Sequence, residues 1–253
     1  LPAGTTLDQL VGRDTWARIE GRFIKAGFPA ATAKLMGNVE PWAFNTLLPM
    51  IDYLVALQTK PPLDKMLYEQ AVQAGKAVAG LETIAEQLSV FQSFSRDEQI
   101  QMLRDSLDLL DRYEAEGRQP IEEMIRAWMS GDSQSLVALL DDGFGTDPLI
   151  RERAENELLW KRNHRFAERM ETEMAAHPDK TSFFAIGALH LPDAPAVPVA
   201  ATDAAPTEED DTGKDQAAPK GPEKVGVVEL MRRRGYTVTR VGAATSRRAK
   251  IGK

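Results

Sequence analysis

The sequence has 253 residues, 43% of them hydrophobic and 27% charged, which are the proportions of a globular protein that can bury a substantial core. It contains no cysteine, which excludes disulfides, thiolate catalysis and cysteine-ligated zinc, and no run of 18 apolar residues that would span a membrane. The formal net charge is −7, and the chain has no basic face of the kind that binds nucleic acid.

Apolar residues at helical spacing predict that most of the first 175 residues are helical. One expected helix carries an apolar stripe made of Trp16, Ile19, Phe23 and Ile24. Another opens with the capping-box pair Ser95 and Glu98. The expected helices cover residues 13–27, 41–60, 63–76, 95–117, 121–128, 133–140 and 147–175.

Three short apolar stretches break the helical pattern and predict buried strands at residues 76–82, 182–187 and 236–241. A helix that ends near Gly235 separates the last two stretches, so this part predicts a βαβ-like unit with parallel pairing. We therefore expect an α/β (or α+β) fold, in which a small mixed or parallel sheet accompanies a large, mostly helical middle region.

The segment 192–224 differs from the rest of the chain in composition. It holds eight acidic residues against three lysines, six prolines and almost no large apolar side chains. Such a segment buries too little surface to offset the entropy lost on ordering, so we expect a disordered insertion. A flexible basic tail is expected at 245–253, and the whole chain is expected to form one domain.

Glu82 is the last residue of one predicted strand, and His190 lies just past the end of another. If the two strands are parallel, both side chains reach the same edge of the sheet, where open α/β sheets place their sites. A carboxylate and an imidazole there could bind a divalent metal or act as acid and base. In the alternative interpretation, Glu82 caps the helix that starts at Thr83 and His190 is a solvated loop residue.

Arg162 and Asn163 form a polar pair on the expected helix 147–175, spaced four residues from apolar positions. A polar pair aimed partly inward needs partners, such as carbonyl groups of another helix, a site carboxylate or a bound anion. The alternative is an arginine that only extends its charged end past its neighbours into solvent.

Four motifs in order give the chain a resemblance to the TraB/GumN (TraB/PrgY/GumN) family: GLETIAEQLSVFQSFSRDEQIQML, KRNHRFAERM, FFAIGALHLP and GVVELMRRRGYTVTRV. The family is similar to the Tiki metalloproteases and to erythromycin esterase and ChaN-like proteins, and it is characterised by two G-x-x-H motifs and a glutamate. By this resemblance Gly187 and His190 match the second G-x-x-H, Glu82 the glutamate, and Arg162 and Asn163 the family's R-N pair. Gln87 and Asp64 match two further polar positions.

The resemblance implies a metal-dependent, peptidase-like hydrolase that acts on a peptide or protein. Its divalent metal would be held by His190 and Glu82, and the catalytic residues would be Glu82, His190 and Arg162. GumN-type members are often exported bacterial proteins, which favours a periplasmic or exported location. The first G-x-x-H is absent, so we expect an N-terminally truncated member with impaired turnover. The alternative is a non-catalytic module that binds a peptide or protein.

Overall fold

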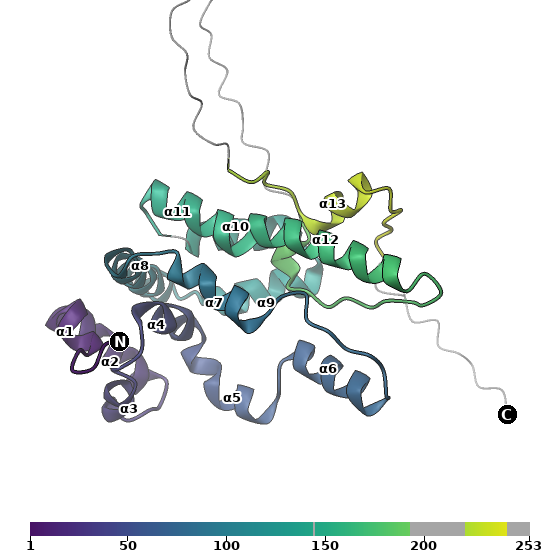
Figure 1. Cartoon of the computed structure of the whole chain (residues 1–253). Coiled ribbons are helices and arrows are strands. Elements are labelled where there is room, and N and C mark those ends of the chain that lie inside the picture. The colour runs from purple at the N-terminus through teal and green to yellow at the C-terminus, as the bar shows by residue number, and fades with distance from the viewer. Residues whose placement is uncertain (144, 193–220, 242–253) are drawn as a thin grey trace, which may run out of the picture.

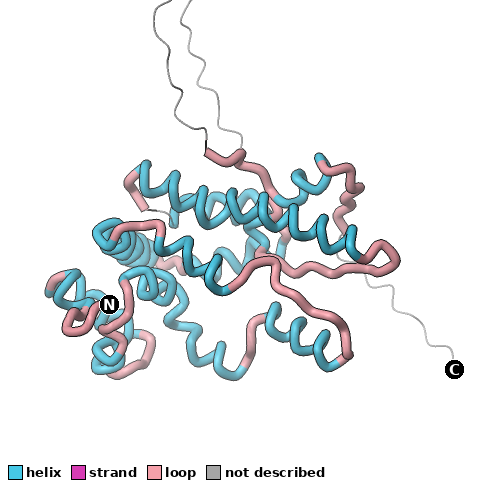
Figure 2. The backbone as a smooth tube through the Cα atoms, viewed as in Figure 1, coloured by secondary structure: helices cyan, strands magenta, loops and turns pink. Residues whose placement is uncertain are grey.

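The computed structural model describes residues 1–143, 145–192 and 221–241, which form helices joined by loops (Figures 1 and 2). The α-helices are α1 (Leu7–Val11), α2 (Arg13–Lys25), α3 (Ala30–Leu35), α4 (Pro41–Leu47), α5 (Leu54–Thr59), α6 (Leu63–Gln73), α7 (Ile84–Gln92), α8 (Arg96–Ala115), α9 (Pro120–Ser130), α10 (Ser133–Gly143), α11 (Pro148–Glu155), α12 (Lys161–Ala176) and α13 (Val227–Arg233). Two 3₁₀ turns, η1 (Leu48–Tyr53) and η3 (Ala188–His190), and one π-helical turn, η2 (Asn156–Trp160), complete the set.

The largest core lies between the N-terminal helices and α8. Its fully buried side chains include Phe23, Phe44 and Leu103, which come from α2, α4 and α8. Helix α8 begins as its capping box predicts, because Ser95 Oγ accepts from the Glu98 N–H and Glu98 Oε2 accepts from the Ser95 N–H. This core is separate from the one that contains Phe166 and Met170 of α12.

A long helical rod runs from Pro148 to Ala176 through α11, η2 and α12 (Figure 1). Asp147 caps its start by accepting from the N–H groups of Leu149 and Ile150. A second core joins α12 to α13, with Phe166 and Met170 on one helix and Leu230 on the other. This rod carries Arg162 and Asn163 and therefore positions the candidate site.

The predicted α/β fold is wrong, because none of the described residues forms a strand (Figure 2). The stretches 76–82, 182–187 and 236–241 do contain extended chain, and two of them alternate as strands would. Phe184 and Ile186, and likewise Tyr236 and Val238, pack on the core of α12 and α13. An alternation of apolar and polar residues shows only that one face of the extended chain is buried. A strand also needs a hydrogen-bonded neighbour, and none of these stretches has one among the described residues.

Several helices also differ from their predicted form. The expected helix 41–60 is divided into α4, η1 and α5, where Pro49 lacks the N–H that a continuous α-helix would use. Ile24 is exposed, although Trp16, Ile19 and Phe23 are buried as predicted. Helices α5 and α6 bury no residue. Residues 193–220 of the expected insertion (192–224) and the whole of the expected tail (245–253) lie outside the described residues. No described helix is long and apolar enough to cross a bilayer.

Candidate functional site

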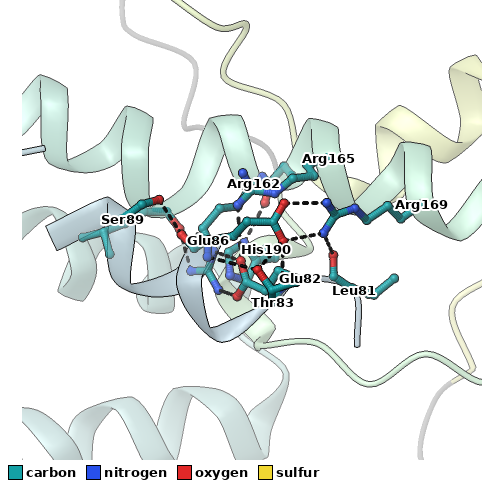
Figure 3. Close-up of polar contacts among 11 residues, drawn as sticks. Leu81, Glu82, Thr83, Glu86, Ser89, Arg162, Arg165, Arg169 and His190 are labelled. Carbon is teal, nitrogen blue, oxygen red and sulfur yellow. Dashed lines mark hydrogen bonds and ion pairs between the residues drawn. The ribbon is translucent and has the colours of Figure 1, made fainter. Parts of the chain in front are cut away.

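Helix α12 directs a row of arginines toward the start of α7 (Figure 3). Arg162, Arg165 and Arg169 are spaced three and four residues apart, so they share one face of the helix. Asn163, Phe166 and Met170 occupy the neighbouring, buried face. A single helix therefore contributes a cationic row to one side of the site and buried packing to the other.

Glu82 lies in this row of arginines, one residue before the α7 N-cap. Its Oε2 accepts from Arg162 Nε at 3.1 Å, and its Oε1 accepts from Arg162 Nη2 at 2.5 Å. Arg165 Nη2 adds a third contact at 3.3 Å. The Glu82 and Arg162 side chains are only 13% and 15% exposed, so this two-point ion pair is shielded from water. Glu82 is thus held by arginines, and the helix cap is Thr83 instead.

Arg169, the last arginine of the row, forms a second ion pair with Glu86. Arg169 donates to Glu86 Oε1 at 2.5 Å and to the Leu81 carbonyl at 2.6 Å. Arg169, together with the Thr83 N–H and hydroxyl, lowers the pKa of the Glu86 carboxyl to about 2. Thr83 and Glu86 also complete the capping box of α7, so the same carboxylate fixes both the helix start and its approach to α12.

His190 lies in η3 and is buried, with 7% of its surface exposed. Asn163 donates through Nδ2 to the Val225 carbonyl at 2.9 Å, which turns its Oδ1 toward His190. That oxygen lies 2.7 Å from His190 Nδ1 and can only accept. Nδ1 therefore carries the imidazole proton, and Nε2 presents a lone pair that accepts no hydrogen bond from the described residues.

Burial keeps His190 neutral. Desolvation and, to a smaller extent, the positive charge of Arg162 lower its pKa to about 4, and the negative charge of Glu82 offsets part of this shift. Phe166 packs against the ring edge to face, with centroids 5.1 Å apart. The ring is thus oriented, neutral across physiological pH and electrostatically coupled to both members of the Glu82–Arg162 pair. The alternative of a solvated loop histidine does not fit this environment.

A cavity of about 470 Å³ opens beside His190. Its walls come from α9, α10, the π-helical turn and η3. The residues lining it are Ile121, Met124, Ile125, Trp128, Leu136, Leu140, Leu158, Leu159, Arg162, Gly187, Ala188, Leu189 and His190. Arg162 and His190 are the two charged or titratable side chains in this set. The site therefore combines one polar end with a largely apolar chamber.

The remaining residues singled out from the sequence lie in different places. The Gly187 carbonyl accepts from the His190 N–H at 3.0 Å, and Gly187 lines the cavity. Gln87 is exposed on α7. Asp64 is exposed on α6, where its Oδ1 accepts from the Lys65 N–H. The structure thus brings together Glu82, Arg162, Asn163, Gly187 and His190.

The described residues do not by themselves fit a catalytic metal centre. Such a centre usually takes three protein ligands. In residues 1–143, 145–192 and 221–241, no group of three histidine, aspartate or glutamate side chains could hold a metal ion. His190 supplies one open nitrogen, but the Glu82 oxygens already accept from two guanidinium groups.

Sequence reasoning missed several contributors to the site. Arg165 and Arg169 were detectable, because their spacing from Arg162 places all three on one helical face. Phe166, Val225 and the cavity residues of α9 and α10 had no signal of their own, since apolar side chains and backbone carbonyls look alike in cores and in sites. The π-helical turn before Arg162 also has no sequence signature, although such turns are frequent at functional sites.

Comparison with known proteins gives a consistent family match. The sequence profile of the TraB/PrgY/gumN family matches residues 1–198. A metalloprotease TIKI homolog of Nematostella vectensis is 25% identical over 232 residues, covering 76% of this chain and 49% of the relative. Metalloprotease TIKI2 of Danio rerio is 24% identical over 229 residues, covering 76% and 44%. The chain thus spans about half the length of these curated relatives, and no solved structure matches it significantly.

Proposed function

Because this chain belongs to the TraB/PrgY/gumN family, whose matched relatives include metalloproteases, we propose that it carries part of the active site of a peptidase-like hydrolase. The substrate would be a peptide or protein. The observation that carries the proposal is the His190 ring, which Asn163 orients with its Nε2 lone pair free at the wall of a cavity. A buried, oriented and neutral imidazole next to an ion pair is typical of a working group.

The surrounding residues have distinct roles in this proposal. His190 Nε2 supplies the lone pair that acts on the attacking water, either directly or as the ligand of a bound metal, and Asn163 positions the ring. Arg162 donates to the amide oxygen as negative charge develops on it. Within the described residues, three of its five N–H groups donate to Glu82 and to the Leu158 carbonyl, which leaves two for substrate. Glu82 positions Arg162 and does not act as the base.

Because the matched relatives are named metalloproteases, the proposal includes a divalent metal bound by this chain. In that case His190 Nε2 would be one ligand, and the chemistry supplied would be activation of water. The other ligands would have to come from outside the described residues, because Glu82 is engaged by Arg162 and Arg165.

A second candidate function is peptide binding without turnover. The apolar cavity favours it. Under this alternative, peptide is captured by the cavity and released unchanged, and chelators have no effect.

A mixed peptide library with mass-spectrometric detection separates the two functions. The chain is incubated with the library in the presence of Zn²⁺, Mn²⁺ or Co²⁺, or with chelator. We expect metal-dependent cleavage that His190→Ala abolishes and that His164→Ala leaves intact, since His164 is half-buried outside the cavity lining and its Nε2 lies 3.1 Å from the Glu223 carbonyl oxygen. Peptide retention without cleavage would support the binding alternative instead.

A further inference from the structure

The cavity beside His190 has an apolar wall to which the proposed reaction assigns no role. Helices α9 and α10 contribute Ile121, Met124, Ile125, Trp128, Leu136 and Leu140 to it, and these six side chains are all apolar. Leu158 and Leu159 continue the same wall from the π-helical turn. A peptide bond placed at His190 would therefore have an apolar chamber next to it.

The size and openness of the chamber fit a side chain that enters from solvent. Its volume of about 470 Å³ lies within the range of small-ligand sites, roughly 300–1,000 Å³. Ile125 is 43% exposed and Trp128 is also exposed, so the wall is reachable from outside. Large apolar side chains left open in a concave surface are characteristic of binding sites.

The charge distribution of the chamber selects against charged occupants. None of its lining residues is acidic. The N–H groups of Arg162 are taken up by Glu82, by the Leu158 carbonyl and, in the proposed function, by the substrate amide oxygen. A lysine or aspartate side chain placed there would lose its hydration without gaining a partner, which is costly. An apolar side chain would gain from burial instead.

The π-helical turn links the chamber to the polar end of the site. It adds a residue to the turn just before α12, so Leu158 and Leu159 both line the cavity while Arg162 does so one turn later. The Leu158 carbonyl also accepts from Arg162 Nη1 at 3.0 Å, which fixes the guanidinium at the chamber's edge. The apolar wall and the group assigned to the amide oxygen thus belong to one continuous structure.

We propose that this chamber is the specificity pocket of the site and that it holds a large apolar side chain (leucine, methionine or phenylalanine) of the substrate, next to the amide bond that faces His190. The inference rests on the proposed function and adds the substrate class to it. Ile125, at the chamber mouth, is the residue that limits the size of the side chain accepted.

Binding of capped amino-acid amides tests the proposal without requiring cleavage. N-acetyl-phenylalanine amide, the leucine amide, and the aspartate and lysine amides are titrated into the ¹³C-methyl-labelled wild-type chain and followed by NMR. We expect the phenylalanine and leucine amides to bind, with intermolecular NOEs to methyl groups of Ile125 and Leu189, and the charged amides to bind at least about tenfold more weakly. Equal binding of all four amides, or no NOE to these methyls, would overturn the proposal.

A matched pair of variants on α9 locates the pocket. Ile125→Trp fills the chamber mouth, whereas Met129→Trp introduces the same side chain at a position that is 75% exposed and does not line the cavity. Ile125→Trp should weaken phenylalanine-amide binding about tenfold or more, and Met129→Trp should leave it unchanged. Similar losses in both variants would contradict the assignment. If Ile125→Trp does not fold, the NOEs of the wild-type chain still show whether the amide binds in the chamber.

The outcomes separate this inference from the proposed function. Apolar amides that bind in the chamber, in a chain that cleaves no peptide, would leave the pocket standing and remove the hydrolase. Cleavage with no preference for an apolar residue at the scissile bond would support the hydrolase and overturn the specificity pocket. Binding of a long-chain fatty acid in the chamber, with no binding of any amide, would show a lipid site and overturn the peptide pocket.

Discussion

Oδ1 of Asn163 lies 2.7 Å from Nδ1 of His190, and this contact decides which nitrogen of the imidazole is open. Asn163 is completely buried, and its amide nitrogen is committed to the Val225 carbonyl. The asparagine therefore cannot rotate to offer a donor without breaking a buried hydrogen bond. Helix α12 thus controls the tautomer of a histidine that lies 27 residues further along the chain.

The first prediction concerns stability at low pH. The pKa of His190 is lowered to about 4 in the folded chain, mainly by burial, so the unfolded chain binds the proton more tightly. Stability should therefore fall as the pH decreases from about 6.5 toward 4, by an amount on the order of 3 kcal/mol across that window. Urea unfolding at a series of pH values measures the loss. His190→Gln should flatten the profile in this range, and identical slopes in both proteins would refute the assignment.

A second prediction addresses the positioning role of Asn163. Asn163→Asp replaces the amide with a carboxylate, which stabilises the protonated imidazole and removes the donor to Val225. We expect the pKa of His190 to rise from about 4 toward or above its ordinary value, as measured by proton NMR titration of the ring. Asn163→Ala should instead destabilise the chain by roughly 2–4 kcal/mol, since it leaves buried polar groups unpaired. An unshifted His190 titration in Asn163→Asp would argue against the contact.

A third prediction compares the two ion pairs of the arginine row. The Glu82–Arg162 pair is shielded, so Arg162→Met should leave Glu82 poorly compensated and cost about 2–4 kcal/mol of unfolding free energy. The matched change Arg169→Met affects the more exposed Glu86 pair and should cost distinctly less. Chemical denaturation of both variants and of their double mutants with Glu82→Gln and Glu86→Gln gives the coupling energies. Equal couplings would show that burial does not distinguish the two pairs.

A fourth prediction concerns the role of Arg162 in the reaction. With Arg162→Lys the charge remains but the two-point geometry toward Glu82 is lost. If Arg162 stabilises the developing oxyanion, kcat for peptide cleavage should fall about 10²–10³-fold with little change in KM. Arg165→Lys, which removes the longer contact at 3.3 Å, serves as the control and should retain most of the rate. A change confined to KM would place Arg162 in substrate binding alone.

Sequence patterns predicted the helical part of the fold well, for physical reasons that are local. Capping boxes at Ser95 and Thr83 and the apolar spacing along α2 and α8 depend on neighbours within a few residues. Strand pairing depends on partners that are distant in sequence, and the alternation of Phe184 and Ile186 showed only that one face is buried. The α/β prediction failed at that step.

The candidate site was partly visible for the same reason. Glu82, Arg162, Asn163 and His190 stood out because polar residues at inward positions need partners. Their actual pairing was not predictable: Glu82 joins Arg162 and Arg165, while Asn163 joins His190 and Val225. These contacts span 27 to 83 residues of sequence and follow from how the helices pack.

Long-range ¹H–¹⁵N NMR of the histidine rings tests the central claim most directly. The spectrum distinguishes a protonated from an unprotonated ring nitrogen, and the exposed His177 supplies a reference signal in the same sample. Between pH 5 and 8, His190 should show a protonated Nδ1 and an unprotonated Nε2, with protonation setting in only as the pH approaches about 4. A proton on Nε2, or a ring that titrates near pH 6.5, would contradict the account.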